Sequence, residues 1–301
     1  MLKSGAIVDM VSSLFSSITE IQEIILRCFV SLLNFETVCE LMPKIDGGKS
    51  IVSTLASLSP VSKELALNCL LMLSKYPASR QNIYESGVIK ILVGLLSSVN
   101  ENVQEKSLNI LANILSEPYS EKDVLENDVF ANISYLLNSP TDKIRTSIYK
   151  LLISTNKTVL HFKNQIILHG IVHCVIMSLK SNEVLIQNIS SELISSFSSD
   201  KDFRITLREG GCIPLLIDLL LSQNDQVLQS VVLSLSNICY EPQDSQTIRE
   251  LGGVHALITL IVHPIEQVRG CTVLALGNLG KKKKKNSKFL QIFYFSKRSK
   301  M

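Results

Sequence analysis

The 301-residue sequence contains no tryptophan, and only 19% of its residues are charged. Its mainly apolar runs, such as residues 215–221 and 256–262, are much shorter than the roughly 18–20 residues that a membrane-spanning helix needs. We therefore expect no transmembrane segment. The first residues also lack a secretory signal, and Leu2 stands where a myristoylation site requires glycine. Because 46% of the residues are apolar, the chain can still bury a large core.

Cysteine pairs are missing as well. The seven cysteines are scattered along the chain without any Cys-x-x-Cys pair. An odd number of cysteines without a signal peptide is typical of a reducing compartment. We therefore expect a cytoplasmic protein, or a nuclear one if the lysine-rich end of the chain acts as a signal.

No group of residues suited to catalysis stands out, because the sequence shows neither a Ser/His/Asp nor a paired-carboxylate arrangement. Residues 47–50 (Gly-Gly-Lys-Ser) resemble the end of a phosphate-binding loop, but Pro43 stands where that loop requires glycine. The histidines of segment 169–174 are separated by the helix-breaking Gly170, and no second group with metal-ligand spacing follows. We expect no enzyme activity, no cofactor and no metal ion.

What the sequence does contain is a period of about 40 residues. One glycine or aspartate recurs with spacings of 43, 39, 41, 42, 41 and 42 residues, at Gly5, Gly48, Gly87, Asp128, Gly170, Gly211 and Gly253. The surrounding text also recurs, as in residues 85–92 and 209–216. A fixed period of this length with helical content is typical of a stacked solenoid, which offers an extended surface to partners.

The sixth repeat shows the expected helices most clearly. A first helix over residues 202–209 ends at Gly210-Gly211, because glycine tolerates the left-handed backbone that follows a helix. A second helix starts near Pro214, a residue suited to a first helical turn. A third helix follows the turn residues 222–225, and its buried stripe is Val227, Leu228, Val231, Leu235 and Ile238.

The pattern Gly-Gly-[Ile/Val]-x-x-Leu-[Leu/Ile], followed by a Val and a later Leu-x-Asn-[Ile/Leu], resembles the armadillo repeat. Residues 103–114, 227–238 and 268–279 are the best copies of its second part. HEAT repeats are the nearby alternative, but the glycine between the first two helices favours armadillo. The resemblance implies an all-α, right-handed superhelical solenoid of about seven three-helix repeats over residues 1–280. Their approximate bounds are 1–37, 38–76, 77–118, 119–155, 156–198, 199–240 and 241–280.

In armadillo proteins the third helices line a concave groove, and an Asn near each helix end bonds the backbone of an extended peptide. Asn suits this task because its amide both donates and accepts. The resemblance places these residues at Asn34, Asn113, Asn237 and Asn278, whereas the other repeats carry Met72, Ile153 and Ser195. We therefore expect a ladder of asparagines that is broken in the middle.

Four residues earlier, the same helix face holds Val30, Asn68, Asn109, Tyr149, Ser191, Leu233 and Leu274. Armadillo import receptors resemble one another in carrying Trp there, and in this chain only Tyr149 offers a ring. Two turns back from the Asn position, Arg27 and Lys106 are the cations, too few for the basic groove of the catenin type. We expect a mixed, partly apolar groove.

Charge divides the chain into a body and a tail. Residues 281–301 carry nine Lys or Arg and no acid, which leaves 21 basic against 27 acidic residues and a net charge of −6 in the body. An acidic body argues against nucleic-acid binding by the repeats. We expect the tail to be disordered. Its lysines from Lys281 to Lys285 fit an import signal or a contact with an anionic surface, but the abrupt change in composition favours a foreign scar on a truncated protein.

The sequence thus predicts a non-catalytic scaffold or adaptor that holds an extended or helical partner segment in its groove. One alternative is a truncated interaction module of a larger ciliary, cytoskeletal, vacuolar-membrane or ubiquitin-ligase protein. A nuclear-transport receptor is a second alternative, disfavoured by the missing Trp residues. The predicted groove residues are Asn34, Asn113, Asn237, Asn278, Asn68, Asn109, Tyr149, Lys106 and Arg27.

Overall fold

The structure is a computed structural model that describes residues 4–154 and 156–280, with the backbone alone for residues 4 and 156–161. Within these residues all regular structure is helical, which confirms the predicted all-α fold. The predicted tail 281–301 lies outside the described residues. The chain forms two compact units, an N-terminal unit that ends at Gln165 and a C-terminal unit that begins at Ile166.

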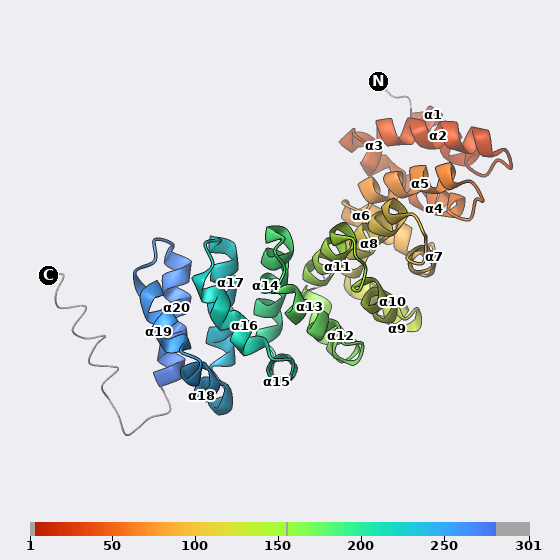
Figure 1. Cartoon of the computed structure of the whole chain (residues 1–301). Helices are drawn as coiled ribbons and strands as arrows, with labels where there is room; N and C mark the ends of the chain where they lie inside the picture. The colour runs from red at the N-terminus through yellow and green to blue at the C-terminus, as the bar shows by residue number, and fades with distance from the viewer. Residues whose placement is uncertain (1–3, 155, 281–301) are drawn as a thin grey trace. The chain divides into compact units, whose positions relative to one another are not determined.

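The N-terminal unit consists of a helix pair followed by three helix triplets (Figure 1). The pair is α1 (Ser4–Ser13) and α2 (Thr19–Leu32). The triplets are α3 (Glu36–Leu41), α4 (Gly47–Thr54) and α5 (Pro60–Leu73); α6 (Pro77–Tyr84), α7 (Val88–Leu95) and α8 (Glu101–Leu115); and α9 (Glu121–Glu126), α10 (Val129–Leu136) and α11 (Asp142–Ser154). Short 3₁₀ turns follow α3 (Met42–Ile45) and precede α9 (Pro118–Ser120).

The C-terminal unit repeats the triplet. Helix α12 (Asn156–Leu168) contains the border between the units. The remaining helices are α13 (Ile171–Ser178) and α14 (Val184–Ser198); α15 (Lys201–Glu209), α16 (Cys212–Asp218) and α17 (Asp225–Ile238); and α18 (Pro242–Glu250), α19 (Gly253–Thr259) and α20 (Glu266–Gly280). The 3₁₀ turns Leu219–Leu221 and Leu260–Val262 extend α16 and α19.

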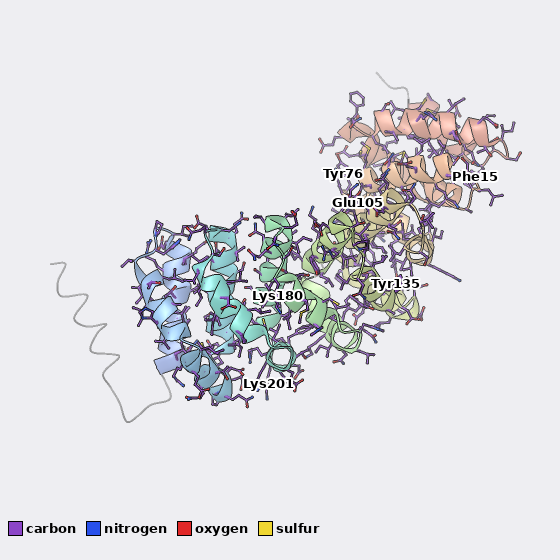
Figure 2. All side chains as sticks on the ribbon, viewed as in Figure 1. Phe15, Tyr76, Glu105, Tyr135, Lys180 and Lys201 are labelled. Carbon is purple, nitrogen blue, oxygen red and sulfur yellow. The ribbon has the colours of Figure 1, made fainter. Side chains whose placement is uncertain are left out.

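The last helix of each repeat, which we call the third helix, packs against the third helices of its neighbours. In the N-terminal unit α2, α5, α8 and α11 pack in this order. In the C-terminal unit α17 lies between α14 and α20, as Figure 1 shows. Side chains fill the spaces between neighbouring helices in each unit (Figure 2). Each repeat therefore contributes one helix to a continuous layer within its unit.

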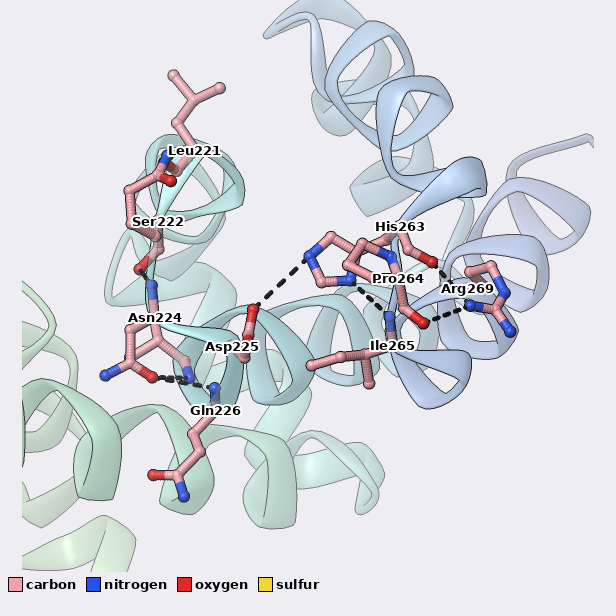
Figure 3. Close-up of polar contacts among 11 residues, drawn as sticks. Leu221, Ser222, Asn224, Asp225, Gln226, His263, Pro264, Ile265 and Arg269 are labelled. Atoms are coloured by element: carbon pink, nitrogen blue, oxygen red, sulfur yellow. Dashed lines mark hydrogen bonds and ion pairs between the residues drawn. The ribbon is translucent and has the colours of Figure 1, made fainter.

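Polar caps start the third helices where the sequence predicts turns. The Asn224 side chain accepts hydrogen bonds from the backbone N–H groups of Gln226 and Val227, which have no partner inside α17 (Figure 3). Ser59 caps α5 in the same way, and Pro60 occupies the first position of that helix. The prediction that residues 222–225 provide the cap of the third helix is confirmed.

The joint between the first two helices of a repeat is a single residue with left-handed backbone. Six of the described residues have this conformation, namely Asp46, Gly87, Asp128, Gly170, Gly211 and Gly252. Three predicted joints are therefore wrong, because Gly5 and Gly48 lie inside α1 and α4 and Gly253 begins α19. At Gly48 the requirement is space rather than backbone freedom, since an added Cβ would come within 2.6 Å of the Asn82 side-chain oxygen.

We expect Gly211→Ala to destabilise the protein by about 1–2 kcal/mol, because its φ of 71° is unfavourable for a residue with a Cβ. Space is not the reason, since an added Cβ would meet no atom within 4 Å. Urea unfolding would measure the change in the free energy of unfolding.

Gly270→Ala is the matched control. Gly270 lies inside α20, and its Cβ would also meet open space. This substitution should stabilise the protein by about 0.5–1 kcal/mol. An equal effect of both substitutions would contradict the assignment of Gly211 as a strained joint.

Candidate functional site

The distance along the chain from each joint to its third helix is constant. Counting 26 residues from the six left-handed joints reaches Met72, Asn113, Ser154, Ser196, Asn237 and Asn278, which we call position 26. Position 22 lies one helical turn earlier and comprises Asn68, Asn109, Lys150, Glu192, Leu233 and Leu274. Position 18 lies a further turn back and comprises Glu64, Glu105, Thr146, Asn188, Gln229 and Gly270. Because residues four apart lie on the same side of a helix, these positions form one face of each third helix, which we call the third-helix face.

Burial corrects the predicted register in the fourth and fifth repeats. Tyr149 is 1% exposed and stands 21 residues after its joint, as does the fully buried Leu108. The prediction that Tyr149 offers a ring to a partner is therefore wrong, because one residue rotates a helical position by about 100°. The exposed Lys150 occupies position 22 instead. By the same count Ser154 and Ser196 replace Ile153 and Ser195 at position 26.

The first repeat also differs from the prediction. Helix α2 ends at Leu32, so Asn34 lies in the turn beyond it. The Asn34 amide donates to the carbonyl oxygens of Val30 and Ser31 at 3.3 and 3.1 Å and therefore caps its own helix. Helix α1 has no left-handed joint, so we align this repeat by the 41-residue recurrence of Glu23, Glu64 and Glu105, which places Ser31 at position 26 and the exposed Arg27 at position 22.

Two of the predicted asparagines make the same contact with the preceding repeat. The amide nitrogen Nδ2 of Asn113 donates to Ser74 Oγ at 2.9 Å, and that of Asn237 donates to Ser198 Oγ at 3.0 Å. Both serines are fully buried, and each hydroxyl donates its own proton to the carbonyl three residues back. These contacts join α5 to α8 and α14 to α17.

The serine hydroxyl decides which way each asparagine amide points. Because the only hydroxyl proton is already donated within its own helix, the serine can only accept from Asn. Asn113 and Asn237 must therefore direct Nδ2 towards the serine. Both asparagines are half-buried, and neither side-chain oxygen has a hydrogen bond to a described residue. Each unit thus carries one oriented amide on its third-helix face.

The remaining predicted asparagines are placed differently. Asn278 is 5% exposed, and its Nδ2 donates to the Ser236 carbonyl at 3.0 Å, so it joins α20 to α17 within the stack. Asn68 and Asn109 occupy position 22 on the neighbouring helices α5 and α8, and both are half-buried. The structure therefore brings Asn68, Asn109 and Asn113 together on one face of the N-terminal unit.

Three glutamates at position 18 were missed by sequence reasoning, although Glu23, Glu64 and Glu105 recur every 41 residues. Each accepts from a side chain of the next repeat. Glu23 accepts from Ser59 at 2.7 Å, Glu64 from Lys106 at 2.9 Å, and Glu105 (labelled in Figure 2) from Lys143 at 2.6 Å. Lys106 therefore forms an ion pair with Glu64 and is not the free cation that the sequence predicted in the groove.

The C-terminal unit has its own contacts between neighbouring repeats. Asn188 Nδ2 donates to Gln226 Oε1 at 3.1 Å, and Asp225 Oδ1 lies 3.7 Å from His263 Nε2. Figure 3 shows the second contact together with Arg269, whose guanidinium donates to the carbonyls of His263 and Pro264 at 2.8 and 2.7 Å. The cation of Arg269 is thus used to hold the turn that leads into α20.

Two further segments contain residue types that bind phosphate or metal ions in other proteins. Lys49, of the segment that resembles a phosphate loop, contacts Asp46 at 3.2 Å and Glu85 at 3.1 Å. His169 follows the end of α12, and His173 lies in α13. Among the described residues no three His, Cys, Asp or Glu side chains are close enough to hold a metal ion. In the same residues no helix is long and apolar enough to cross a membrane.

Comparison with known proteins identifies the repeat. The family model of the armadillo/beta-catenin-like repeat matches residues 77–116 and 200–240. The chain contains armadillo repeats. The two matched armadillo repeats are those that contain the oriented amides of Asn113 and Asn237. No curated protein matches the sequence.

Solved structures share the armadillo fold. An engineered protein aligns with a TM-score of 0.85 at 22% identity, over 91% of this chain and 68% of its own. The designed armadillo repeat protein YIII(Dq)4CqI aligns with a TM-score of 0.70 at 20% identity, over 77% and 99%. The designed armadillo repeat protein YIII(Dq.V1)4CPAF, in complex with peptide (KR)4, gives 0.70 at 20%, over 77% and 98%. At these identities the likeness concerns the fold alone.

We expect Ser198→Ala to release the Asn237 amide, because it removes the acceptor that orients Nδ2. The loss of this hydrogen bond should destabilise the armadillo stack by about 1 kcal/mol. ¹⁵N relaxation of the Asn237 side-chain amide should report larger motion in the variant than in the wild type.

Ser199→Ala is the matched control. Ser199 Oγ also donates to the carbonyl three residues back, but it makes no contact with Asn237. The Asn237 amide should relax as in the wild type in this variant. Unchanged relaxation in Ser198→Ala would mean that packing, not the hydroxyl, orients the amide.

The thiols should differ sharply in reactivity. Burial raises the pKa of Cys69, Cys212 and Cys239 to about 12, so these thiols stay protonated at pH 8. The thiolate is the reactive form, and Cys28 is the exposed cysteine. We expect one fast thiol in a dithionitrobenzoate assay of the native protein, lost in Cys28→Ser. All seven should react in denaturant. Fast reaction of several thiols in native Cys28→Ser would contradict this burial.

Proposed function

We propose that the protein is a non-catalytic scaffold or adaptor that binds an extended segment of a partner protein along its third-helix faces. The observation that carries the proposal is the pair of oriented amides at Asn113 and Asn237. An extended segment presents unpaired backbone N–H and C=O groups, which a preoriented amide can bind without first losing rotational freedom. A related designed protein of the same fold is in complex with the peptide (KR)4, which supports a peptide as the class of partner.

A nuclear-transport receptor is less well supported. The sequence has no Trp with which to pack the stems of basic side chains. Position 22 instead holds Arg27, Asn68, Asn109 and Lys150 in the N-terminal unit. Lys150 is exposed and has no ion pair with a described residue. Cations at this position would repel a basic signal.

Selection of random 12-residue peptides displayed on phage, against the immobilised full chain, tests the proposal. We expect enriched peptides whose affinity falls about fivefold for Asn113→Ala/Asn237→Ala, because a peptide bound to either unit loses one net hydrogen bond of about 1 kcal/mol. Fluorescence anisotropy of the synthesised peptides would measure the loss.

Asn132→Ala/Asn138→Ala is the matched control, since both residues belong to the second helix α10 and the turn after it. These substitutions should leave the affinity unchanged. If no peptide is enriched, the proposed function is wrong. If peptides bind both double variants equally, binding occurs on another surface.

A further inference from the structure

Position 22 of the C-terminal unit carries large apolar side chains in solvent. Leu233 on α17 is 38% exposed, and Leu274 at the equivalent place on α20 is 54% exposed. Glu192 holds the same position on α14. Since α17 packs against both α14 and α20, these three residues follow one another across the third-helix face. Leu233 is exposed although its helix has a neighbour on each side.

The third helices of the C-terminal unit carry more carboxylates than cations. The third helices α14, α17 and α20 contain three carboxylates, at Glu192, Asp225 and Glu266, and one cation, Arg269. Arg269 is held by the His263 and Pro264 carbonyls, and Asp225 lies beside His263. Glu192 is exposed and makes no ion pair with a described residue. An exposed carboxylate beside two exposed leucines therefore remains available to a partner.

The N-terminal unit has the opposite character, which shows that this combination is not a general feature of the repeat. There the position-18 glutamates are bonded to Ser59, Lys106 and Lys143. The exposed charges at position 22 are the cations Arg27 and Lys150. The face around Leu233 is thus the apolar and acidic part of the third helices.

We propose that the third-helix face of the C-terminal unit binds an extended segment with apolar side chains that cover Leu233 and Leu274 and a basic side chain that pairs with Glu192. This proposal rests on the proposed function and specifies its partner. Asn237 lies one turn after Leu233 on the same side of α17. A main chain bonded to the Asn237 amide would therefore place its side chains beside the two leucines. Complementary charge at Glu192 adds selectivity between partners.

The test uses three labelled 10-residue peptides and the full chain in about 0.1 M salt, where charges within roughly 10 Å still interact. One peptide alternates Val and Lys, the second Val and Glu, and the third Ser and Lys. We expect the Val–Lys peptide to bind most tightly in fluorescence anisotropy. Glu192→Lys should weaken its binding about fivefold and strengthen that of the Val–Glu peptide. Leu233→Ser should reduce Val–Lys binding to the level of the Ser–Lys peptide.

Glu209→Lys is the matched control, because it makes the same charge change at an exposed residue of the same unit, on the first helix α15 rather than on a third helix; it should leave Val–Lys binding unchanged. The same preference in the wild type and Glu192→Lys overturns the proposal. So does a concentration-dependent dimer in sedimentation that Leu233→Ser abolishes, because a second copy would then cover the face. The charge-swap variant keeps the test valid if Leu233→Ser unfolds.

Failure of this proposal can be separated from failure of the proposed function. Phage-selected peptides that require Asn237 but lack apolar and basic residues would leave the peptide-binding function intact and refute the partner chemistry. Val–Lys binding that depends on Leu233 and Glu192 but not on Asn237 would support the partner chemistry and refute backbone recognition by the amide.

Discussion

A backbone constraint at the joint between the first two helices sets the register of the six helix triplets. At Asp46, Gly87, Asp128, Gly170, Gly211 and Gly252 the chain turns through a left-handed residue. From there 26 residues always lead to the same position on the third helix. Asp46 is supported by Asn82, whose Nδ2 donates to its carboxylate at 2.9 Å. Without a common joint, each one-residue slip would turn a different side of the third helix to solvent.

Contacts between repeats decide which polar side chains remain available. Ser74 and Ser198 are used entirely inside the stack, yet they determine the direction of the Asn113 and Asn237 amides. Lys106 is neutralised by Glu64 of the preceding repeat. A side chain on the third-helix face therefore has a role that depends on the neighbouring repeat. This dependence is expected for a solenoid, in which each repeat touches only its neighbours.

The same scaffold carries two different surfaces. In the N-terminal unit position 22 is polar, with exposed cations at Arg27 and Lys150. In the C-terminal unit it is apolar at Leu233 and Leu274, with a free carboxylate at Glu192. Because position 22 contributes little to the core, its residues can differ between repeats without loss of the fold. Recognition therefore resides in a few exposed positions rather than in the armadillo architecture itself.

The period of about 40 residues and the turn residues before α17 were sufficient to predict the helical repeat from the sequence, because these signals lie in the local sequence. The asparagines at 113 and 237 were also predictable, since the Leu-x-Asn text marks them. The left-handed joints at Asp46 and Gly252, the burial of Tyr149 and the exposure of Lys150 were not, because neighbouring glycines and a one-residue shift leave the text almost unchanged. Only the packed structure showed the direction of the two amides and the pairing of Lys106, since both depend on side chains from a repeat about 40 residues away.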